Sequence, residues 1–263
     1  MIDFHNHILP NVDDGSKSLE MSLNMLRLAE EQGITEVVNT VHYQHPKVEN
    51  EDISFKRING EIQKLQQELD KNRIKVKLHI GAEVFFLPNL MEIKNDPLTT
   101  FNGSNYMLIE FLTYNLPDSH EQQFYNLKMA GITPIIAHPE RYKFVQNDLN
   151  NVVRWLELGC LIMVDAGSVL KQFGDECFLA AESIIKNQWC HILGSDAHND
   201  GRRNFCLKDS FNIVKNWLGD DAYPLVYDNP RAVISGEKIE IDFEYVSENT
   251  SNLIGRIKEM IGF

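Results

Sequence analysis

The chain has 263 residues, of which 43% are hydrophobic and 24% charged, a balance typical of a soluble globular protein. It contains no run of about 18 apolar residues and no signal-like segment at either end, so we expect no membrane insertion and a cytoplasmic location. The formal charge of −13 would repel a polyanion, which argues against a nucleic-acid partner.

Strand and helix patterns alternate along the chain. Short apolar segments predict buried strands, and segments with apolar residues at helical spacing predict amphipathic helices. In chain order we expect strands over 2–8, 34–41, 76–82, 106–111, 132–137, 160–164 and 189–194, and helices over 18–32, 53–71, 122–130, 149–158, 178–186 and 207–218.

This alternation predicts a parallel sheet with helical crossovers, either closed into a barrel or opened into a doubly wound layer. No linker or repeat interrupts it, so we expect one α/β domain over 1–236. The remaining segment, 237–263, differs in pattern and is expected to be an appendage of the same domain. In it, Ile239, Ile241 and Phe243 alternate as in an edge strand, and Leu253, Ile254, Ile257 and Ile261 suit a short amphipathic helix.

Histidine and carboxylate side chains stand at or just beyond the ends of most predicted strands. In a β/α barrel the carboxyl ends of the strands converge on one face, where catalytic groups gather. The residues placed there, with Asp14 in the loop after the first strand, are His5, His7, Asp14, His42, Glu83, Glu110, His138, Asp196 and His198.

Such a set predicts a metal centre. His5 and His7 lie two apart on a strand, so both side chains would point to one side and could share an ion. Imidazole together with carboxylate suits manganese, zinc or iron better than magnesium or calcium. The set is larger than one ion needs, which favours two or three ions of the kind that clamp a phosphoester.

The remaining histidines and the cysteines have plainer interpretations. We expect His79, His120 and His191 to be hydrogen-bonded core residues and His45 to lie on a surface loop. None of the cysteines has an arginine six residues later, as a cysteine phosphatase requires, and we expect free, partly buried thiols at Cys160, Cys177, Cys190 and Cys206. With no G-x-S-x-G motif and no P-loop, a metal-bound hydroxide is the expected nucleophile.

Two arginines complete the predicted site. Arg141 follows His138 by three residues and Arg203 follows His198 by five, each on a loop leaving the proposed metal face. A guanidinium there could hold phosphate oxygens in a bidentate manner. Arg202 is an alternative to Arg203, and a solvated surface arginine is the alternative interpretation for each.

These residues resemble the PHP (polymerase and histidinol phosphatase) superfamily through D-x-H-x-H at 3–7, His42 and S-D-x-H at 195–198. Further blocks, V-D-D-G at 12–15, G-A-E at 81–83, L-I-E-F at 108–111, A-H-P-E-R-Y at 137–142 and D-N-P-R at 228–231, resemble the bacterial tyrosine-protein phosphatases of capsule and exopolysaccharide loci (CpsB/CapC type).

This resemblance, over about 1–236, implies a distorted seven-stranded β/α barrel of the TIM-like PHP type and a trinuclear manganese centre, with iron or zinc as alternatives. It assigns His5, His7, Glu83 and Asp196 to a first ion, Glu83, Glu110 and His138 to a second, and Asp14, His42 and His198 to a third. It also implies phosphate contacts at Arg141 and Arg203, and a substrate on the phosphotyrosine tail of a bacterial tyrosine kinase. The segment 237–263 has no counterpart in this family, and a role in a homo-oligomer or as a lid is open.

Three other functions share parts of this pattern. A small-molecule phosphatase of the histidinol-phosphate type would use the same ligands on an alkyl phosphate. A PHP-type nuclease is disfavoured by the acidic balance and by the lack of a basic groove. A catalytically silent PHP regulatory module would be expected to lack ligands, and none is missing.

Overall fold

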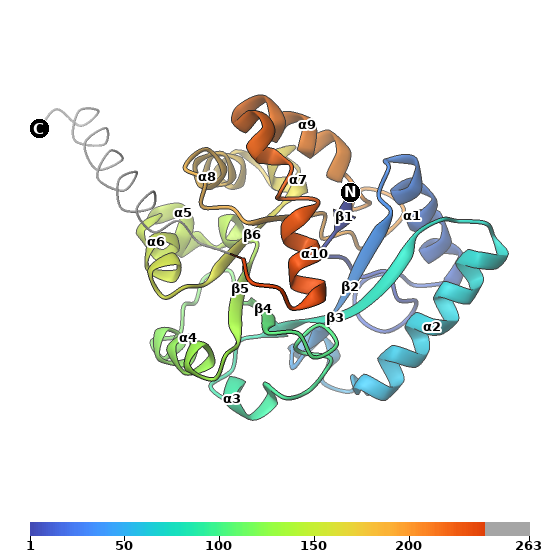
Figure 1. Ribbon diagram of the computed structural model, residues 1–263, viewed down its shortest axis with the longest axis horizontal. Coiled ribbons are helices and arrows are strands. Elements are labelled where there is room, and N and C mark those ends of the chain that lie inside the picture. The colour runs from blue at the N-terminus through green and yellow to red at the C-terminus, as the bar shows by residue number, and fades with distance from the viewer. Residues whose placement is uncertain (240–263) are drawn as a thin grey trace, which may run out of the picture.

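The computed structural model describes residues 1–239, and within them seven parallel strands follow one another around a sheet in chain order (Figure 1). Each pairs with the next through a parallel register. The strands are β1 (Ile2–Asp3), β2 (Glu36–Tyr43), β3 (Lys77–Phe85), β4 (Tyr106–Glu110), β5 (Thr133–Ala137), β6 (Leu161–Asp165) and β7 (Ile192–Gly194).

The last strand returns to the first, which makes the sheet a nearly closed barrel. Asn6 and Ala197 form a parallel bridge just beyond β1 and β7. The amide of Asp196 donates to the carbonyl of His5, and the amide of His7 to the carbonyl of Ala197, each at 2.8 Å. The chain therefore takes the closed arrangement and not the doubly wound one.

Helices cover the outside of the barrel, and the six predicted helices are all present within two or three residues of their expected bounds. Their bounds are α1 (Leu19–Glu31), α2 (Phe55–Lys71), α4 (His120–Met129), α6 (Asn150–Glu157), α8 (Asp175–Lys186) and α9 (Leu207–Leu218). Ser18 caps α1 by accepting from the amide of Met21, as its position predicts. No helix within residues 1–239 is long and apolar enough to cross a membrane.

Several helical segments were not predicted, and all of them except the eight-residue α10 are too short to show helical periodicity in the sequence. They are α3 (Leu90–Ile93), α5 (Lys143–Asn147), α7 (Ala166–Val169), α10 (Asp228–Ser235) and the 3-10 turns η1 (Pro46–Val48), η2 (Pro139–Arg141) and η3 (Gly219–Ala222). Two of them, η2 and α7, lie beside the candidate site described below.

The strands are apolar on both faces, as expected when helices cover a parallel sheet. One cluster of buried residues lies between the sheet and the surrounding helices, and includes Val37, Val41 and Ile58. A smaller cluster fills the barrel interior, and includes Phe4, Val38 and Leu108. Because interior positions near the carboxyl ends carry polar groups instead, the apolar core stops below the predicted metal face.

The predicted first strand is wrong in its extent. A strand was expected over 2–8, but β1 ends at Asp3. The side chain of Asn6 donates to Asp3 Oδ1 at 3.0 Å and to the carbonyl of Val38 at 3.1 Å, so a side chain takes over from the backbone ladder. His5 and His7 therefore reach the centre from an irregular segment and not from the regular alternation of a strand.

The part of the appendage that the structure describes is also not a strand. Ile239 has no regular secondary structure; its amide donates to the hydroxyl of Tyr106 at 3.0 Å, and its side chain packs on the interior cluster. The expected strand positions Ile241 and Phe243, and the helix expected around Ile257, lie outside the described residues. The division at 236 stays a prediction.

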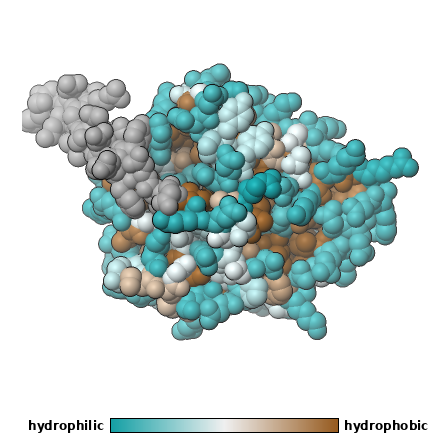
Figure 2. Space-filling view, viewed as in Figure 1, coloured by the Kyte–Doolittle hydropathy of each residue, from teal (hydrophilic) through white to brown (hydrophobic). Residues whose placement is uncertain are grey.

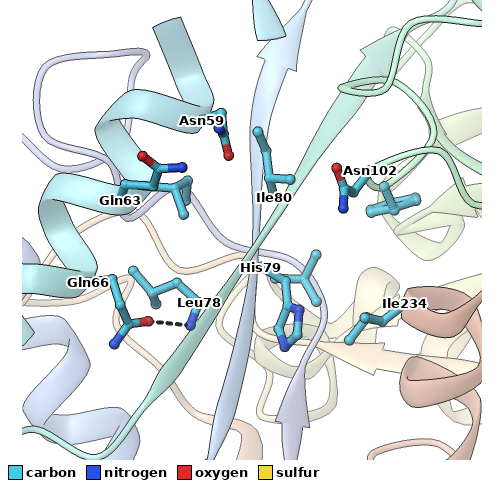
Figure 3. A pocket seen from close by; sticks show the side chains of 11 residues that line it. Asn59, Gln63, Gln66, Leu78, His79, Ile80, Asn102 and Ile234 are labelled. Carbon is cyan, nitrogen blue, oxygen red and sulfur yellow. Dashed lines mark hydrogen bonds between the residues drawn. The ribbon is translucent and has the colours of Figure 1, made fainter. Parts of the chain in front are cut away.

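Helix α10 covers the amino-terminal end of the barrel, where Val233 and Ile234 pack on the interior cluster (Figure 1). Beside it, a hollow of about 310 Å³ opens between α2 and β3, with apolar side chains at its base (Figure 2). The side chain of Gln66 lies there against β3, and its Oε1 accepts from the backbone amide of Leu78 at 2.9 Å (Figure 3). This hollow is at the opposite end of the strands from the candidate site.

Candidate metal centre

The nine predicted ligands come together at the carboxyl ends of the strands. They form four overlapping groups, and within each group the potential ligand atoms lie within 4.8 Å of one another. The groups are His7, Asp14, His42 and His198; His5, His7 and Asp196; His5, Glu83 and His138; and His42, Glu83 and Glu110.

Glu83, near the end of β3, is the residue around which the groups are arranged. Its Oε1 lies 2.7 Å from His138 Nε2 and 3.2 Å from His5 Nε2. Its Oε2 lies 3.0 Å from His42 Nδ1. The two oxygens thus face different imidazoles, which is the arrangement that lets one carboxylate bridge two ions. Glu110 is near His42 here, 3.1 Å from its Nδ1, and His138 groups with His5.

A second carboxylate, Asp14, joins the outer part of the centre. Its Oδ1 lies 3.1 Å from His42 Nε2 and 3.4 Å from His198 Nε2. Its Oδ2 pairs with Lys47 Nζ at 2.6 Å. The loop that carries Asp14 therefore lies over the same face as the strand ends, as the sequence predicts.

The inner imidazoles are oriented by hydrogen bonds from behind. His5 Nδ1 lies 2.5 Å from Thr40 Oγ1, and His7 Nδ1 lies 2.7 Å from Asp13 Oδ2. Each ring thereby presents Nε2 to the centre, the arrangement by which outer partners orient metal-binding histidines. Burial alone would raise the pKa of Asp13, but the adjacent His7 outweighs it and lowers that pKa to about 2.

Several atoms of the centre are buried without a hydrogen bond to any described residue. They are His5 Nε2, His7 Nε2, His42 Nδ1, Asp14 Oδ1 and Glu110 Oε1. Buried polar atoms are nearly always satisfied, so a group of them facing one another needs an explanation. Nitrogen and carboxylate donors together suit divalent transition metals, and the residues fit such ions.

Two of the candidate ligands have unusual backbone conformations. His138 follows β5 with a φ of 33°, and Asp196 lies just beyond β7 with a φ of 46°. Non-glycine residues adopt positive φ at a cost, and such residues concentrate at functional sites. In both cases the strained backbone directs the side chain into the centre.

Both predicted arginines lie at the edge of the centre and converge on one carboxylate. Asp196 turns Oδ1 toward His5, at 3.3 Å from its Nε2. Its Oδ2 pairs with Arg141 Nη1 and, at 2.5 Å, with Arg203 Nη2. The alternative residue, Arg202, has an exposed side chain, so Arg203 is the arginine at the centre.

Acidic residues also lie behind Arg141. Asp165 Oδ2 is 3.3 Å from Arg141 Nη1. Next to it, Glu140 Oε1 accepts from the Asp165 amide at 3.0 Å and from Ser168 Oγ at 2.7 Å. Burial, with the nearby charge of Asp165, raises the pKa of Glu140 to about 8. Burial, with the nearby charge of Asp196, raises the pKa of Asp165 as well, to about 7.

Sequence reasoning missed three residues of this region. His45 was expected on a surface loop, but its side chain is only 13% exposed and its ring stacks on His42 with centroids 4.6 Å apart. Asp13 and Lys47 were not singled out. Asp13 stands beside another aspartate in the V-D-D-G segment, and only the fold shows which of the two faces His7 and which faces His42.

The predicted hydrogen bonds of the other histidines are confirmed; His120 and His191 are buried, but His79 is only partly buried and is not a core residue. His79 pairs with Glu36 at 2.8 Å, His120 Nδ1 with the Pro117 carbonyl at 2.7 Å, and His191 Nδ1 accepts from the Ile162 amide at 3.2 Å. All four cysteines are free. All four are buried, with at most 9% of the residue exposed, where partly buried thiols were expected.

Comparison with known proteins identifies the family. Residues 1–235 match the family model described as capsular polysaccharide synthesis, CpsB/CapC. The chain belongs to the CpsB/CapC family. CapC of Staphylococcus aureus is 32% identical over 240 residues, covering 91% of this chain and 93% of CapC. The tyrosine-protein phosphatase CpsB of Streptococcus pneumoniae is 30% identical over 246 residues, covering 91% of this chain and all of CpsB.

Solved structures agree with this assignment. One comes from work on YwqE of Bacillus subtilis and CpsB of Streptococcus pneumoniae as metal-dependent tyrosine phosphatases. It matches with a TM-score of 0.87 and 27% identity, covering 92% of this chain and 98% of that one. The phosphotriesterase homology protein of Escherichia coli, at 10% identity and a TM-score of 0.54, shares the fold alone. The predicted distorted TIM-like barrel is confirmed.

Proposed function

We propose that this CpsB/CapC protein is a metal-dependent protein-tyrosine phosphatase, a phosphoric monoester hydrolase. The observation that carries the proposal is the convergence of nine histidine and carboxylate side chains at one end of a barrel whose relatives are named tyrosine-protein phosphatases. The buried thiols agree with it, because a cysteine nucleophile must reach the substrate and all four are enclosed.

The centre would hold manganese, as three ions per chain, with iron or zinc as alternatives. The four overlapping groups supply enough donor atoms for several ions, and Glu83 offers an oxygen to each side. When bound, the ions supply Lewis acidity and an activated water for attack on phosphorus. The protein orients the imidazoles through Thr40 and Asp13 and encloses the carboxylates.

Arg141 and Arg203 bind the phosphate. Both lie on the edge of the centre with side chains about a quarter exposed, 26% and 29%, so the guanidinium groups can reach a substrate from beside the metal face. A guanidinium carries several donors in a planar fork that matches phosphate oxygens. Each can therefore neutralise charge on the equatorial oxygens while water attacks in line.

The substrate is a phosphotyrosine on a protein, specifically the tail of a bacterial tyrosine kinase that controls capsule or exopolysaccharide synthesis in the cytoplasm. The family description, capsular polysaccharide synthesis, supports this setting. A hollow of about 520 Å³ adjoins the centre at His45 and includes the apolar residues Val48, Phe85 and Leu87. Such a hollow gives room for the polypeptide that flanks a phosphotyrosine.

One assay separates this function from its rivals. Protein loaded with manganese is given a phosphotyrosine peptide, a phosphoserine peptide and histidinol phosphate at matched concentrations. We expect kcat/KM to be highest for the phosphotyrosine peptide. Faster turnover of histidinol phosphate would move the protein to the small-molecule class, and no turnover of any substrate by fully loaded protein would indicate a silent regulatory module.

The ligand assignment has its own test. His42→Ala and His138→Ala should each lower the metal content per chain, measured by mass spectrometry, together with activity. His79→Ala serves as the matched control, because His79 pairs with Glu36 away from the centre and its loss should leave metal content unchanged. Full metal content in both ligand variants would contradict their assigned role.

A further inference from the structure

The two arginines at the centre share an aromatic partner. Arg141 Cζ lies 4.6 Å from the centroid of the Phe173 ring, and Arg203 Cζ lies 5.8 Å from the same centroid. A guanidinium within about 6 Å of a ring is attracted by its negative face. The two arginines therefore share two partners: both form ion pairs with Asp196, and both lie against the Phe173 ring.

The local fold leaves space for this ring at one backbone position. A Cβ added to Gly167, in α7, would lie 2.9 Å from Phe173 Cε2 and 2.9 Å from Gln172 Oε1. The Gln172 amide donates to the Gly167 carbonyl at 2.9 Å, which ties the segment carrying Phe173 back onto α7. The ring thus rests on bare backbone, and a larger residue at 167 would displace it.

Phe173 does not serve as an ordinary core residue. Among the described residues, it belongs to neither of the two apolar clusters and is only half-buried. Its ring lies against the guanidinium groups of Arg141 and Arg203. A half-buried phenylalanine placed on two arginines, and not in the core, points to a role in the arrangement of those arginines.

We infer that Phe173 is a positioning residue that holds Arg141 and Arg203 side by side for phosphate binding, and this inference rests on the phosphate role proposed for the two arginines. Asp196 Oδ2 holds one end of each guanidinium, and Asp165 Oδ2 also lies 3.3 Å from Arg141 Nη1. The ring restricts the remaining freedom of the two long side chains. Immobilising such side chains only when ligand binds would weaken affinity, and holding them beforehand avoids that cost.

The test compares Phe173→Leu with Phe173→Tyr in metal-loaded protein. Phe173→Leu keeps an apolar side chain but removes the ring, and we expect the inhibition constant of inorganic phosphate and the KM for a phosphotyrosine peptide to rise together. The expected rise is about fivefold to thirtyfold, equivalent to about 1–2 kcal/mol. Phe173→Tyr keeps an aromatic ring and should leave both constants at their wild-type values. Metal content should be unchanged in both variants.

Two further variants make the result specific. Phe178→Leu is the matched control, because that ring lies 4.6 Å from Lys171 Nζ and packs against Trp217, and its loss should leave phosphate inhibition unchanged. Gly167→Ala retains Phe173 but displaces it, and should weaken phosphate inhibition in the same direction as Phe173→Leu.

The outcomes separate this inference from the proposed function. If Arg141→Ala weakens phosphate inhibition while Phe173→Leu does not, the positioning role is wrong and the arginine role stands. If Phe173→Leu raises only the peptide KM and leaves phosphate inhibition unchanged, the ring contacts the tyrosine and the inference is again overturned. If neither change affects phosphate inhibition in metal-loaded protein, the phosphate role proposed for Arg141 fails.

Discussion

Asp13 Oδ2 lies 2.7 Å from His7 Nδ1 and also accepts from the backbone amide of His42 at 3.2 Å. Asp13 is not itself a candidate ligand. Its carboxylate orients two residues that are, His7 through the ring and His42 through the backbone. Its other oxygen accepts from the Gly15 amide at 3.0 Å, which fixes the loop that carries Asp14.

Replacing Asp13 should therefore weaken metal binding without removing a ligand. For Asp13→Asn we expect metal affinity to fall by about tenfold to a hundredfold, the usual effect of losing an outer partner. Titration calorimetry of the metal-free protein with manganese measures it. Asp148→Asn is the control, because Asp148 accepts from the Asn150 amide and is not among the candidate ligands or their partners. An equal loss of metal affinity in Asp148→Asn would contradict a specific role for Asp13.

The cysteines lead to a second prediction. Burial raises the pKa of the Cys190 thiol to about 12, and it raises the pKa values of Cys160, Cys177 and Cys206 as well. Thiols react as thiolates, so folded enzyme should keep its activity after treatment with N-ethylmaleimide at neutral pH. Denatured protein should be modified at all four positions. Inactivation of folded enzyme in step with the modification of one cysteine would revive a thiol-dependent mechanism.

A third prediction concerns acid stability. Burial lowers the pKa of His191 to about 4, because the ring is enclosed and its Nδ1 accepts from the Ile162 amide. In the unfolded chain a histidine has a pKa of about 6.5, so folding favours the neutral ring. The resulting stability is fully present above about pH 6.5 and is lost as pH falls toward 4, by at most about 3 kcal/mol.

The variant His191→Asn separates this effect from the other acid-sensitive groups. Asparagine can still accept from the Ile162 amide but does not titrate. Between pH 6.5 and 4, the free energy of unfolding should fall less steeply for the variant than for the wild type, measured by denaturant titration at each pH. Parallel slopes, or a His191 pKa near 6.5 by NMR, would contradict the assignment.

Much of the barrel and of the metal centre could be predicted because the signals are local and regular. Apolar segments mark the strands, and the carboxyl ends of parallel strands must converge, so His42, Glu83 and His138 could be placed together from sequence. The extent of β1 could not, because it depends on Asn6, whose side chain reaches back to Asp3 and across to Val38.

The residues that were missed act through spatial contacts that residue type does not reveal. His45 follows His42 by three residues, and nothing in the sequence indicates that its ring stacks on that histidine. In the sequence Phe173 is an ordinary apolar residue, and only the fold places Arg141 and Arg203, from two other loops, against its ring. Residue type marks a ligand, but the role of an aromatic ring or a second carboxylate depends on its neighbours in space.

The last prediction tests how the barrel interior is filled at its amino-terminal half. A Cβ on Gly81 of β3 would lie 2.4 Å from Phe101 Cδ1, so the ring sits directly on the strand backbone. Phe101 has a φ of 47°, unusual for a bulky residue, and packs on Phe4 with centroids 4.9 Å apart. β3 pairs with β4 only from Glu83 onward, and the ring fills the space before that point.

Gly81→Ala should destabilise the protein by about 1–3 kcal/mol, because the ring must shift or the strand must bend. Phe101→Ala should cost about 3–5 kcal/mol through the cavity it leaves. In the double variant, however, the alanine at 81 meets no ring, so its added cost should be close to zero. A double-mutant cycle from denaturant unfolding measures this coupling, and additive costs would mean that Phe101 does not account for the glycine.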